Sequence, residues 1–359
     1  MKTLLDSLYI AWIIGSKDIL DAIKNKNARN NIFLMVGMVI FFYYLNGSRP
    51  FDKNIHAVVY DEGKTSLSLE KVTLEDGAVY SFREAASIQQ MEAKMANQSL
   101  GLALPADLDQ TLASGDTPTL GGYIFWVDRM KVAKLEARYS QDFSEIFGQP
   151  VTVAIGENII IPQANVDGAH GSVAYLMIFF VFSTALLLIP HLILEEKQTR
   201  TMDALLTSPA SPGQIVLGKA LAGFFYILII GGLWIALNWA YIVNWGIVLA
   251  AFLGYALLAI GLALLIGSFM TSPRQLSIWM LVIMLLMMIP AIFYMESNLK
   301  AGIWAVLTWF PSSALTSLLR FSCSTGITQA LVWANLSIVI ASIAIVFGLV
   351  VWKVRRSDR

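Results

Sequence analysis

The charged residues of this chain are spread very unevenly along its length. The stretch from residue 171 to residue 352 has only ten charged side chains, whereas residues 1–170 have 35 and residues 353–359 have five. Soluble domains carry about 25% charged residues, so ten charges are too few to cover the surface of a soluble domain of that size. The second half of the chain is therefore predicted to lie in a membrane, and most of the first half in water.

Six segments are predicted to be membrane-spanning helices, which need about 20 apolar residues. The first has a short apolar core and no small-residue cleavage site after it, so we interpret it as an uncleaved signal anchor. The segment near 300–325 contains Gly302 and Pro311 and is predicted to be re-entrant, rather than a seventh span. The predicted spans are residues 31–46, 172–194, 213–242, 247–270, 274–295 and 329–352.

Basic residues mark one side of the predicted membrane domain. They precede the first span, flank the second and third, and follow the sixth in the tail of residues 353–359, whereas the connection at 243–246 has none. Lysine and arginine are enriched in cytoplasmic loops. Both termini are therefore predicted to be cytoplasmic, residues 47–171 to lie outside, and the protein to be a multi-pass protein of the plasma (cytoplasmic) membrane.

Residues 1–30 precede the first span and have apolar residues at helical spacing, with charged residues between them. This pattern predicts an amphipathic helix. The helix could pack on its own membrane domain, but we favour a position in the cytoplasmic interface of the membrane.

Residues 47–171 are too many for a loop and are predicted to fold by themselves. The β-branched run Ile55–Tyr60 is typical of a strand, whereas Phe82–Asn97 and Met130–Phe147 have helical periodicity. Alternating strands and helices indicate a small α/β domain. The predicted fold class is an α-helical polytopic membrane protein with six transmembrane helices and an extracytoplasmic α/β domain inserted between helices 1 and 2.

The stretch at about 195–208, after the second predicted span, is predicted to be a short cytoplasmic helix. It begins with charged residues and has three apolar residues on one face. That apolar face has no other obvious burial site. This favours a docking surface for a partner over an ordinary loop. The charged residues are Glu195, Glu196 and Lys197, and the apolar residues are Met202, Leu205 and Leu206.

The sequence shows no catalytic residues, no metal site and no cofactor site. The run Gly213–Lys219 matches the start of a P-loop, but Ala220 replaces the hydroxyl residue that binds magnesium. The formal net charge is zero, so no nucleic-acid partner is indicated. Within the spans, Ser183, Thr184 and Asn238 are candidates for lining a pathway, with helix–helix hydrogen bonding as the alternative role.

Several short motifs follow one another in a characteristic order. An acidic–basic cluster after the second span is followed by a threonine, a Leu-Leu pair and a Gly-Lys pair, and further motifs lie near the N-terminus, in the outer domain and before the last span. The motif positions are Glu195–Lys197, Thr201, Met202 and Asp203, Leu205 and Leu206, Ser208–Pro209, Gly218–Lys219, Lys17–Asp18, Gly101–Asp107, Phe310–Pro311 and Arg320.

In their order and spacing these motifs resemble the membrane-spanning permease of type-2 (type V) ATP-binding-cassette (ABC) exporters, over nearly the whole chain. The long outer domain is similar to the sodium-efflux and drug-efflux branches. The resemblance implies two permeases, the second a copy or a paralogue, and two separate ATPase subunits that hold the ATP and magnesium. It also implies that the helix around Thr201–Leu206, which includes Asp203, is a coupling helix that contacts the ATPase.

Two other functions stay open at this point. The chain could be a membrane-anchored sensory or scaffold protein that binds a ligand through its outer α/β domain. It could also be an ion-coupled carrier, although carriers that move protons usually have carboxylates at mid-membrane, and the predicted spans have none there.

Overall fold

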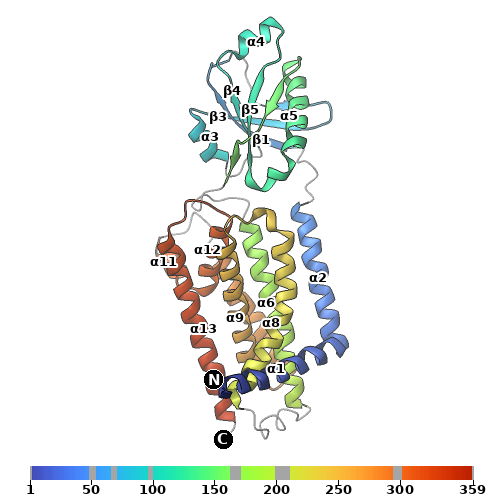
Figure 1. Cartoon of the computed structure of the whole chain (residues 1–359), viewed down its shortest axis with the longest axis vertical. Helices are drawn as coiled ribbons and strands as arrows, with labels where there is room; N and C mark the ends of the chain where they lie inside the picture. The colour runs from blue at the N-terminus through green and yellow to red at the C-terminus, as the bar shows by residue number, and fades with distance from the viewer. Residues whose placement is uncertain are drawn as a thin grey trace. The chain divides into compact units, whose positions relative to one another are not determined.

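The computed structural model describes residues 2–47, 54–65, 71–95, 100–161, 171–198, 211–293 and 301–357. The chain forms two compact units (Figure 1). The helical unit comprises Met1–Leu45, His170–Ser322 and Ile327–Arg359, and the α/β unit comprises Asn46–Ala169 with Cys323–Gly326.

The helical unit contains helices that are long and apolar enough to cross a membrane. Among the described residues, five helices meet this criterion by length and composition, and α6 has a shorter apolar run, Leu176–His191. The chain is therefore a helical protein with five or six candidate spans, as the sequence predicts. Its helices are α1 (Lys2–Lys24), α2 (Lys26–Gly47), α6 (Gly171–Gln198), α8 (Pro212–Leu237), η3 (Trp239–Tyr241), α9 (Trp245–Phe269), α10 (Pro273–Phe293), α11 (Ala301–Leu307), α12 (Pro311–Ser322) and α13 (Gln329–Ser357).

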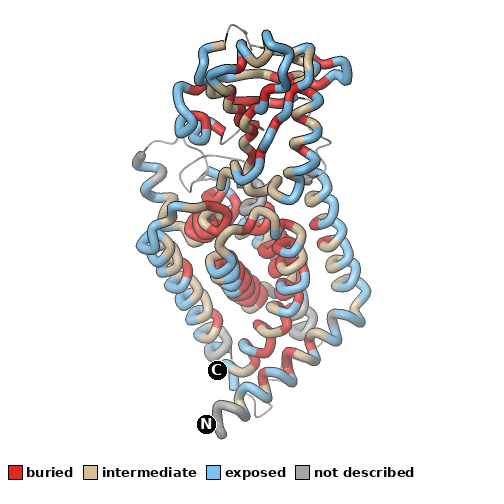
Figure 2. The backbone as a smooth tube through the Cα atoms, turned by 45° about the horizontal axis from the view of Figure 1, so that its top comes forward, coloured by how far each residue is buried: buried red, intermediate tan, exposed pale blue. Residues whose placement is uncertain are grey.

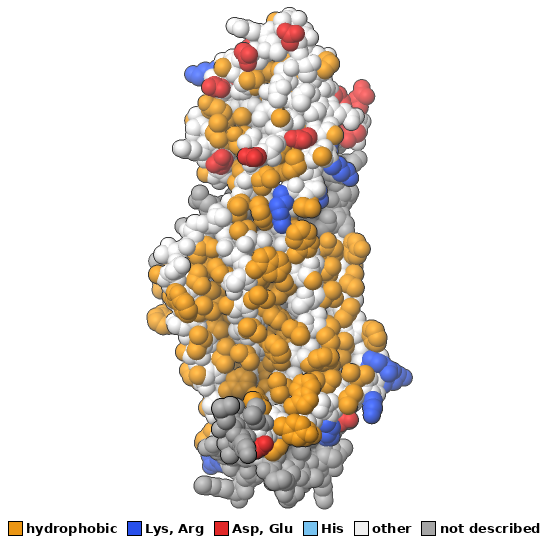
Figure 3. All heavy atoms as spheres, viewed as in Figure 1, with side chains coloured by type: hydrophobic (Ala, Val, Ile, Leu, Met, Phe, Trp, Pro, Cys, Tyr) orange, Lys and Arg blue, Asp and Glu red, His pale blue; other side chains and the backbone are white. Residues whose placement is uncertain are grey.

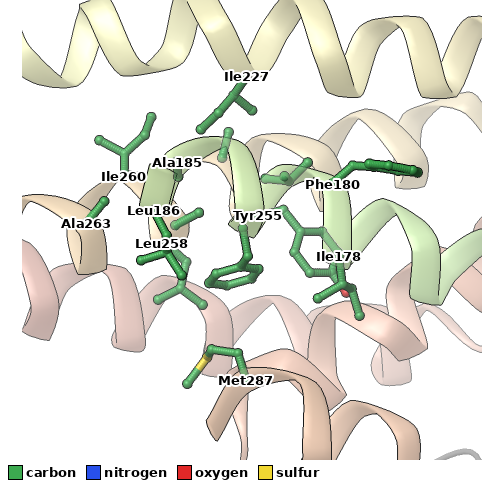
Figure 4. Close-up of a cluster of buried hydrophobic side chains, with 14 of the residues drawn as sticks. Ile178, Phe180, Ala185, Leu186, Ile227, Tyr255, Leu258, Ile260, Ala263 and Met287 are labelled. Atoms are coloured by element: carbon green, nitrogen blue, oxygen red, sulfur yellow. The ribbon is translucent and has the colours of Figure 1, made fainter. Parts of the chain in front are cut away.

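Helix α9 lies at the centre of the helical unit. It is apolar on all sides, which is typical of a buried helix, and it packs against α6, α8, α12 and α13. Figure 2 shows the buried residues concentrated on the inner helices α6, α8, α9 and α12, and Figure 4 shows the apolar cluster that α6, α8, α9 and α10 form. Small residues permit the close packing: a Cβ on Gly231 of α8 would overlap the Phe252 ring.

The outer helices of this unit expose large apolar side chains. Phe33 of α2, Leu281 of α10 and Ile345 of α13 are each more than 60% exposed, and Figure 3 shows hydrophobic side chains over most of the visible face of the helical unit. Apolar surfaces of this extent mark contact with a membrane or another protein.

The α/β unit contains one mixed sheet with the strand order β2-β3-β1-β4-β5-β6, and β7 pairs with β5. Strand β1 is parallel to both β3 and β4, whereas β5 is antiparallel to β4. The elements are β1 (Asn54–Asp61), β2 (Lys71–Thr73), β3 (Val79–Ala85), α3 (Ile88–Lys94), β4 (Leu100–Leu104), α4 (Leu108–Ser114), β5 (Thr119–Phe125), η2 (Trp126–Lys131), α5 (Val132–Phe147), β6 (Thr152–Ala154) and β7 (Ile159–Ile160).

The helix expected over Phe82–Asn97 is wrong in its first part. Residues Phe82–Ala85 belong to β3, which pairs with β1 along its whole length, and the helix begins only at Ile88. Ser87 caps it, because its hydroxyl accepts a hydrogen bond from the Gln90 N–H. The Arg-Glu-Ala-Ala segment favours a helix by propensity, but the tertiary pairing with β1 overrides that preference.

Helix α5 packs on the sheet and is held there by polar contacts. The buried Tyr80 hydroxyl donates to Asp142 Oδ2 at 2.5 Å, and Glu136 Oε1 accepts hydrogen bonds from the N–H groups of Ile155 and Gly156. Burial raises the pKa of Tyr139 from 10.0 to about 12, and the negative charge of Asp128 adds to the effect. Burial raises the pKa of Tyr80 as well, with its hydrogen bond to Asp142 acting in the same direction.

We expect the α/β unit to lose stability as the pH rises from 10 to about 12. Below pH 10, Tyr139 is protonated in both the folded and the unfolded state, so it contributes no pH dependence. Above pH 10 the unfolded tyrosine ionises while the folded one stays neutral, so stability falls by up to about 1.4 kcal/mol per pH unit for this group. Urea unfolding of the full-length protein in detergent micelles, followed by circular dichroism at each pH, checks this.

The variant Tyr139→Phe lacks the titrating hydroxyl and should have a shallower decline over the same pH range. An unchanged slope in that variant would contradict the assignment.

Candidate functional site: the α1–α8 junction

Helix α1 packs along α8 through one narrow face. Ala11, Ile14, Gly15 and Asp18 lie at helical spacing on this face and are buried, and α1 and α8 form one of the largest helix contacts of the unit. Figure 1 shows α1 crossing the end of the helix bundle.

Two glycines let the backbones of α1 and α8 approach closely. A Cβ on Gly218 would lie 2.7 Å from the Ile14 Cβ and 2.9 Å from the Ala11 carbonyl oxygen, and a Cβ on Gly15 would lie 2.9 Å from the Gly218 carbonyl oxygen. No larger side chain fits at either position without moving a helix. Glycine is therefore required at the crossing point.

Beside this crossing, Asp18 of α1 and Lys219 of α8 form a buried ion pair. Lys219 Nζ lies 3.3 Å from Asp18 Oδ2, and both side chains are only 5% exposed. A buried charge that loses its partner costs several kcal/mol. The pair therefore favours one register of α1 on α8.

Hydrogen bonds on either side of the ion pair extend the same contact. The Tyr226 hydroxyl donates to the Ile19 carbonyl oxygen at 2.7 Å, and Gln214 Nε2 donates to Ser7 Oγ at 2.9 Å. Gln214 also completes a capping box with Ser211 at the start of α8. The first turns of α8 are thus held both by their own cap and by α1.

The other faces of α1 expose large apolar side chains beside the exposed Lys17–Asp21 ion pair. Tyr9, Trp12, Ile13 and Leu20 each expose about half or more of their surface. An amphipathic helix with exposed aromatic residues of this kind suits the interface between lipid and water.

The predicted coupling residues lie in and directly after the last turn of α6. Helix α6 extends through Glu195, Glu196 and Lys197 to Gln198, whereas Thr201, Met202, Asp203, Leu205 and Leu206 lie outside the described residues. The connection that contains them joins α6 to α8, which pack side by side. The α1–α8 junction therefore adjoins the point where this connection ends.

The three candidates for lining a pathway are buried. The Thr184 hydroxyl donates to the Phe180 carbonyl oxygen at 2.7 Å, and Asn238 Nδ2 donates to the Trp234 carbonyl oxygen at 2.9 Å. Both bonds run to a residue four positions earlier on the same chain, so they are not helix–helix bonds. A role for Ser183, Thr184 and Asn238 in a pathway stays a prediction.

No metal or nucleotide site emerges from the part of the chain that the structure describes. That part contains no group of three or more histidine, cysteine or acidic residues that could hold a metal ion. The P-loop-like run Gly213–Lys219 lies inside α8. A P-loop instead needs a glycine-rich loop between a strand and a helix, and here Gly218 serves helix packing.

The sequence patterns identified the Lys17–Asp18 and Gly218–Lys219 motifs but not their pairing. A signal was present: Asp18 lies on the same helical face as Ala11 and Ile14, and Lys219 begins a long uncharged stretch. Each is a charge in an apolar setting, where a partner of opposite sign is expected.

The fold is that of a polytopic helical protein with five or six candidate membrane spans. The family model of ABC-2 family transporter proteins matches residues 32–352, which is most of the chain. The chain therefore belongs to the ABC-2 family, as a multi-pass permease subunit whose domain lacks an ATPase site. A search of curated proteins finds no significant match.

Replacing one residue of the Asp18–Lys219 pair should destabilise the helical unit more than replacing both. We expect Asp18→Leu or Lys219→Met alone to cost about 3–5 kcal/mol, because each leaves one buried charge without this partner. The double variant should regain most of that stability. Thermal unfolding of the purified protein measures this, and a double variant that is as unstable as the sum of the single variants would contradict the coupling.

Proposed function

We propose that this permease exports a substrate outward across the cytoplasmic membrane, with ATP hydrolysed by separate ABC ATPase subunits. A second permease, either a copy or a paralogue, completes the translocation path. The observation that carries the proposal is the family match over residues 32–352, together with a connection at 199–210 that is anchored on both sides by long packed helices.

The proposed contact with the ATPase is the stretch from Glu195 to Leu206. Hydrolysis can drive transport only through a contact that differs between nucleotide states. Movement of this stretch reaches α6 through Glu195, Glu196 and Lys197, and reaches α8 through its capped first turn. Because α8 is bound to α1 by the Asp18–Lys219 pair, α1 moves with α8.

The proposed orientation places both termini in the cytoplasm and the α/β unit outside. Lys24 ends α1, and Lys353 and Arg356 lie in the last turns of α13. The positive-inside rule supports a cytoplasmic position for all three. Lys353 Nζ also lies over the Phe269 ring, 4.8 Å from its centroid, at the end of α9 that leads to Arg274. Lys353 and Arg274 are therefore proposed to lie on the same side of the membrane.

The proposed branch is that of the sodium and drug exporters. The support is the α/β unit of over 100 residues between the first candidate span and α6. Ser183 and Thr184 on α6 and Asn238 at the end of α8 are the proposed lining of the pathway, because they are polar residues within the helical unit.

The double variant Leu205→Asp/Leu206→Asp tests the coupling contact. Burying a leucine is worth about 1.5–3 kcal/mol, and a buried carboxylate without a partner is strongly unfavourable. We therefore expect normal membrane levels, no co-purifying ATPase and no ATP-dependent efflux. The control variant Leu205→Met/Leu206→Met keeps the apolar face and should retain both the co-purifying ATPase and ATP-dependent efflux. Full docking and efflux in the aspartate variant would contradict the coupling assignment.

Cysteine labelling tests the orientation. In a Cys323→Ala background, Ser114→Cys on α4 should react with an impermeant thiol reagent in intact cells, whereas Ser357→Cys at the end of α13 should react only after the membrane is opened. Labelling of position 357 in intact cells would show that the topology is wrong.

A further inference from the structure

Three basic residues lie at the elbow where α1 turns into α2. Lys24 ends α1, Lys26 begins α2, and Arg29 follows in the first turn of α2. All three are exposed, and Figure 3 shows lysine and arginine side chains gathered at the corner where the two helices meet in Figure 1. The sequence has no aspartate or glutamate from residue 22 to residue 51. This segment therefore brings three positive charges to the elbow and no negative one.

The acidic residues that come just before the elbow on α1 already have basic partners. Asp21 Oδ2 lies 3.7 Å from Lys17 Nζ on the same helix, and Asp18 Oδ2 lies 3.3 Å from Lys219 Nζ on α8. These two acids therefore do not neutralise the elbow. A group of like charges of this kind attracts a ligand of the opposite sign.

Both arms of the elbow are held against the helix bundle. On the α1 side, the Tyr226 hydroxyl donates to the Ile19 carbonyl oxygen at 2.7 Å. On the α2 side, Ala28 and Ile32 pack against the buried pair of Leu188 from α6 and Tyr226 from α8. The three cations are therefore presented by a fixed corner of the fold, rather than by a free segment.

Apolar side chains flank the cations on both arms of the elbow. Leu20 and Ile23 of α1 and Phe33 and Leu34 of α2 each expose about half or more of their surface. The candidate span Ala28–Leu45 begins directly after Lys26, and only 11% of it is buried inside the protein. A ligand at the elbow therefore meets positive charge and apolar surface together.

An anionic phospholipid matches both features. Its phosphate pairs with lysine and arginine through charge-assisted hydrogen bonds, and its acyl chains cover apolar side chains. Basic residues next to the end of a span lie near lipid headgroups, because their long side chains extend to the membrane surface. Free phosphate would satisfy the cations but would leave the apolar side chains uncovered, so the pattern favours a lipid.

We propose that the α1–α2 elbow is a binding site for an anionic phospholipid. Lys24, Lys26 and Arg29 contact the headgroup phosphate, and Leu20 and Ile23 lie along an acyl chain. The bound lipid fixes the elbow at the membrane surface. This proposal goes beyond the proposed function: it needs neither the ATPase nor the transported substrate, and requires only that α2 crosses the membrane.

Lipid titration of the purified full-length protein in a neutral detergent tests the site. Microscale thermophoresis measures the affinity for phosphatidylglycerol and, separately, for phosphatidylcholine with the same acyl chains. A basic residue near an anionic headgroup contributes about fivefold in affinity. We expect the parent protein to prefer phosphatidylglycerol, and Lys24→Gln/Lys26→Gln/Arg29→Gln to bind it at least about tenfold more weakly, with phosphatidylcholine binding unchanged.

The matched control is Lys353→Gln/Arg355→Gln/Arg356→Gln, which removes three charges from the end of α13, the last helix. It should bind phosphatidylglycerol like the parent protein. The charge-preserving variant Lys24→Arg/Lys26→Arg/Arg29→Lys should also retain binding, which separates the loss of charge from any damage to the fold.

Inorganic phosphate distinguishes a lipid site from a site for a free anion. Phosphate should displace phosphatidylglycerol no more than sodium chloride of equal ionic strength does, because it lacks the acyl chains. Four results would each overturn the proposal: no preference of the parent protein for phosphatidylglycerol, unchanged binding in the elbow glutamine variant, an equal loss in the α13 variant, or specific displacement by phosphate.

Discussion

Asp18 and Lys219 lie 201 positions apart in the sequence and meet in a buried ion pair between α1 and α8. Two charges in so dry a place are tolerated only when their geometry is good. That geometry in turn requires the close helix approach that Gly15 and Gly218 permit. Replacing either glycine with a larger residue would push the helices apart, because the added side chain overlaps the facing helix. The separated helices would pull Asp18 and Lys219 away from each other in apolar surroundings.

Through this contact α1 is joined to α8, and α8 packs on α6, so α1 is linked to both helices that the 199–210 connection joins in sequence. Helix α6 packs on α8 and on the central helix α9, and α8 packs on α1. Under the proposed coupling, a push on the connection would reach the core of the helical unit and the exposed apolar face of α1 at the same time. In a permease driven by a separate ATPase, this is the mechanical property that the connection needs.

The long apolar helices and the α/β unit could be predicted from the sequence, because they depend on local properties such as length, hydropathy and periodicity. Strand β3 could not, because residues such as Glu84 and Ala85 favour a helix, and pairing with β1 decides their conformation. The motifs around Asp18 and Lys219 were visible, but periodicity says nothing about which distant charge pairs with which.

We infer that this chain is the membrane half of an ATP-driven exporter. The most direct measurement is purification of the tagged chain from its own cells, followed by identification of the bound proteins and assay of ATP hydrolysis in proteoliposomes. We expect an ABC ATPase subunit in equal number to the permease, and ATP-dependent efflux that stops when ATP is withheld. A chain that purifies without any ATPase, or that transports equally well without ATP, would contradict it.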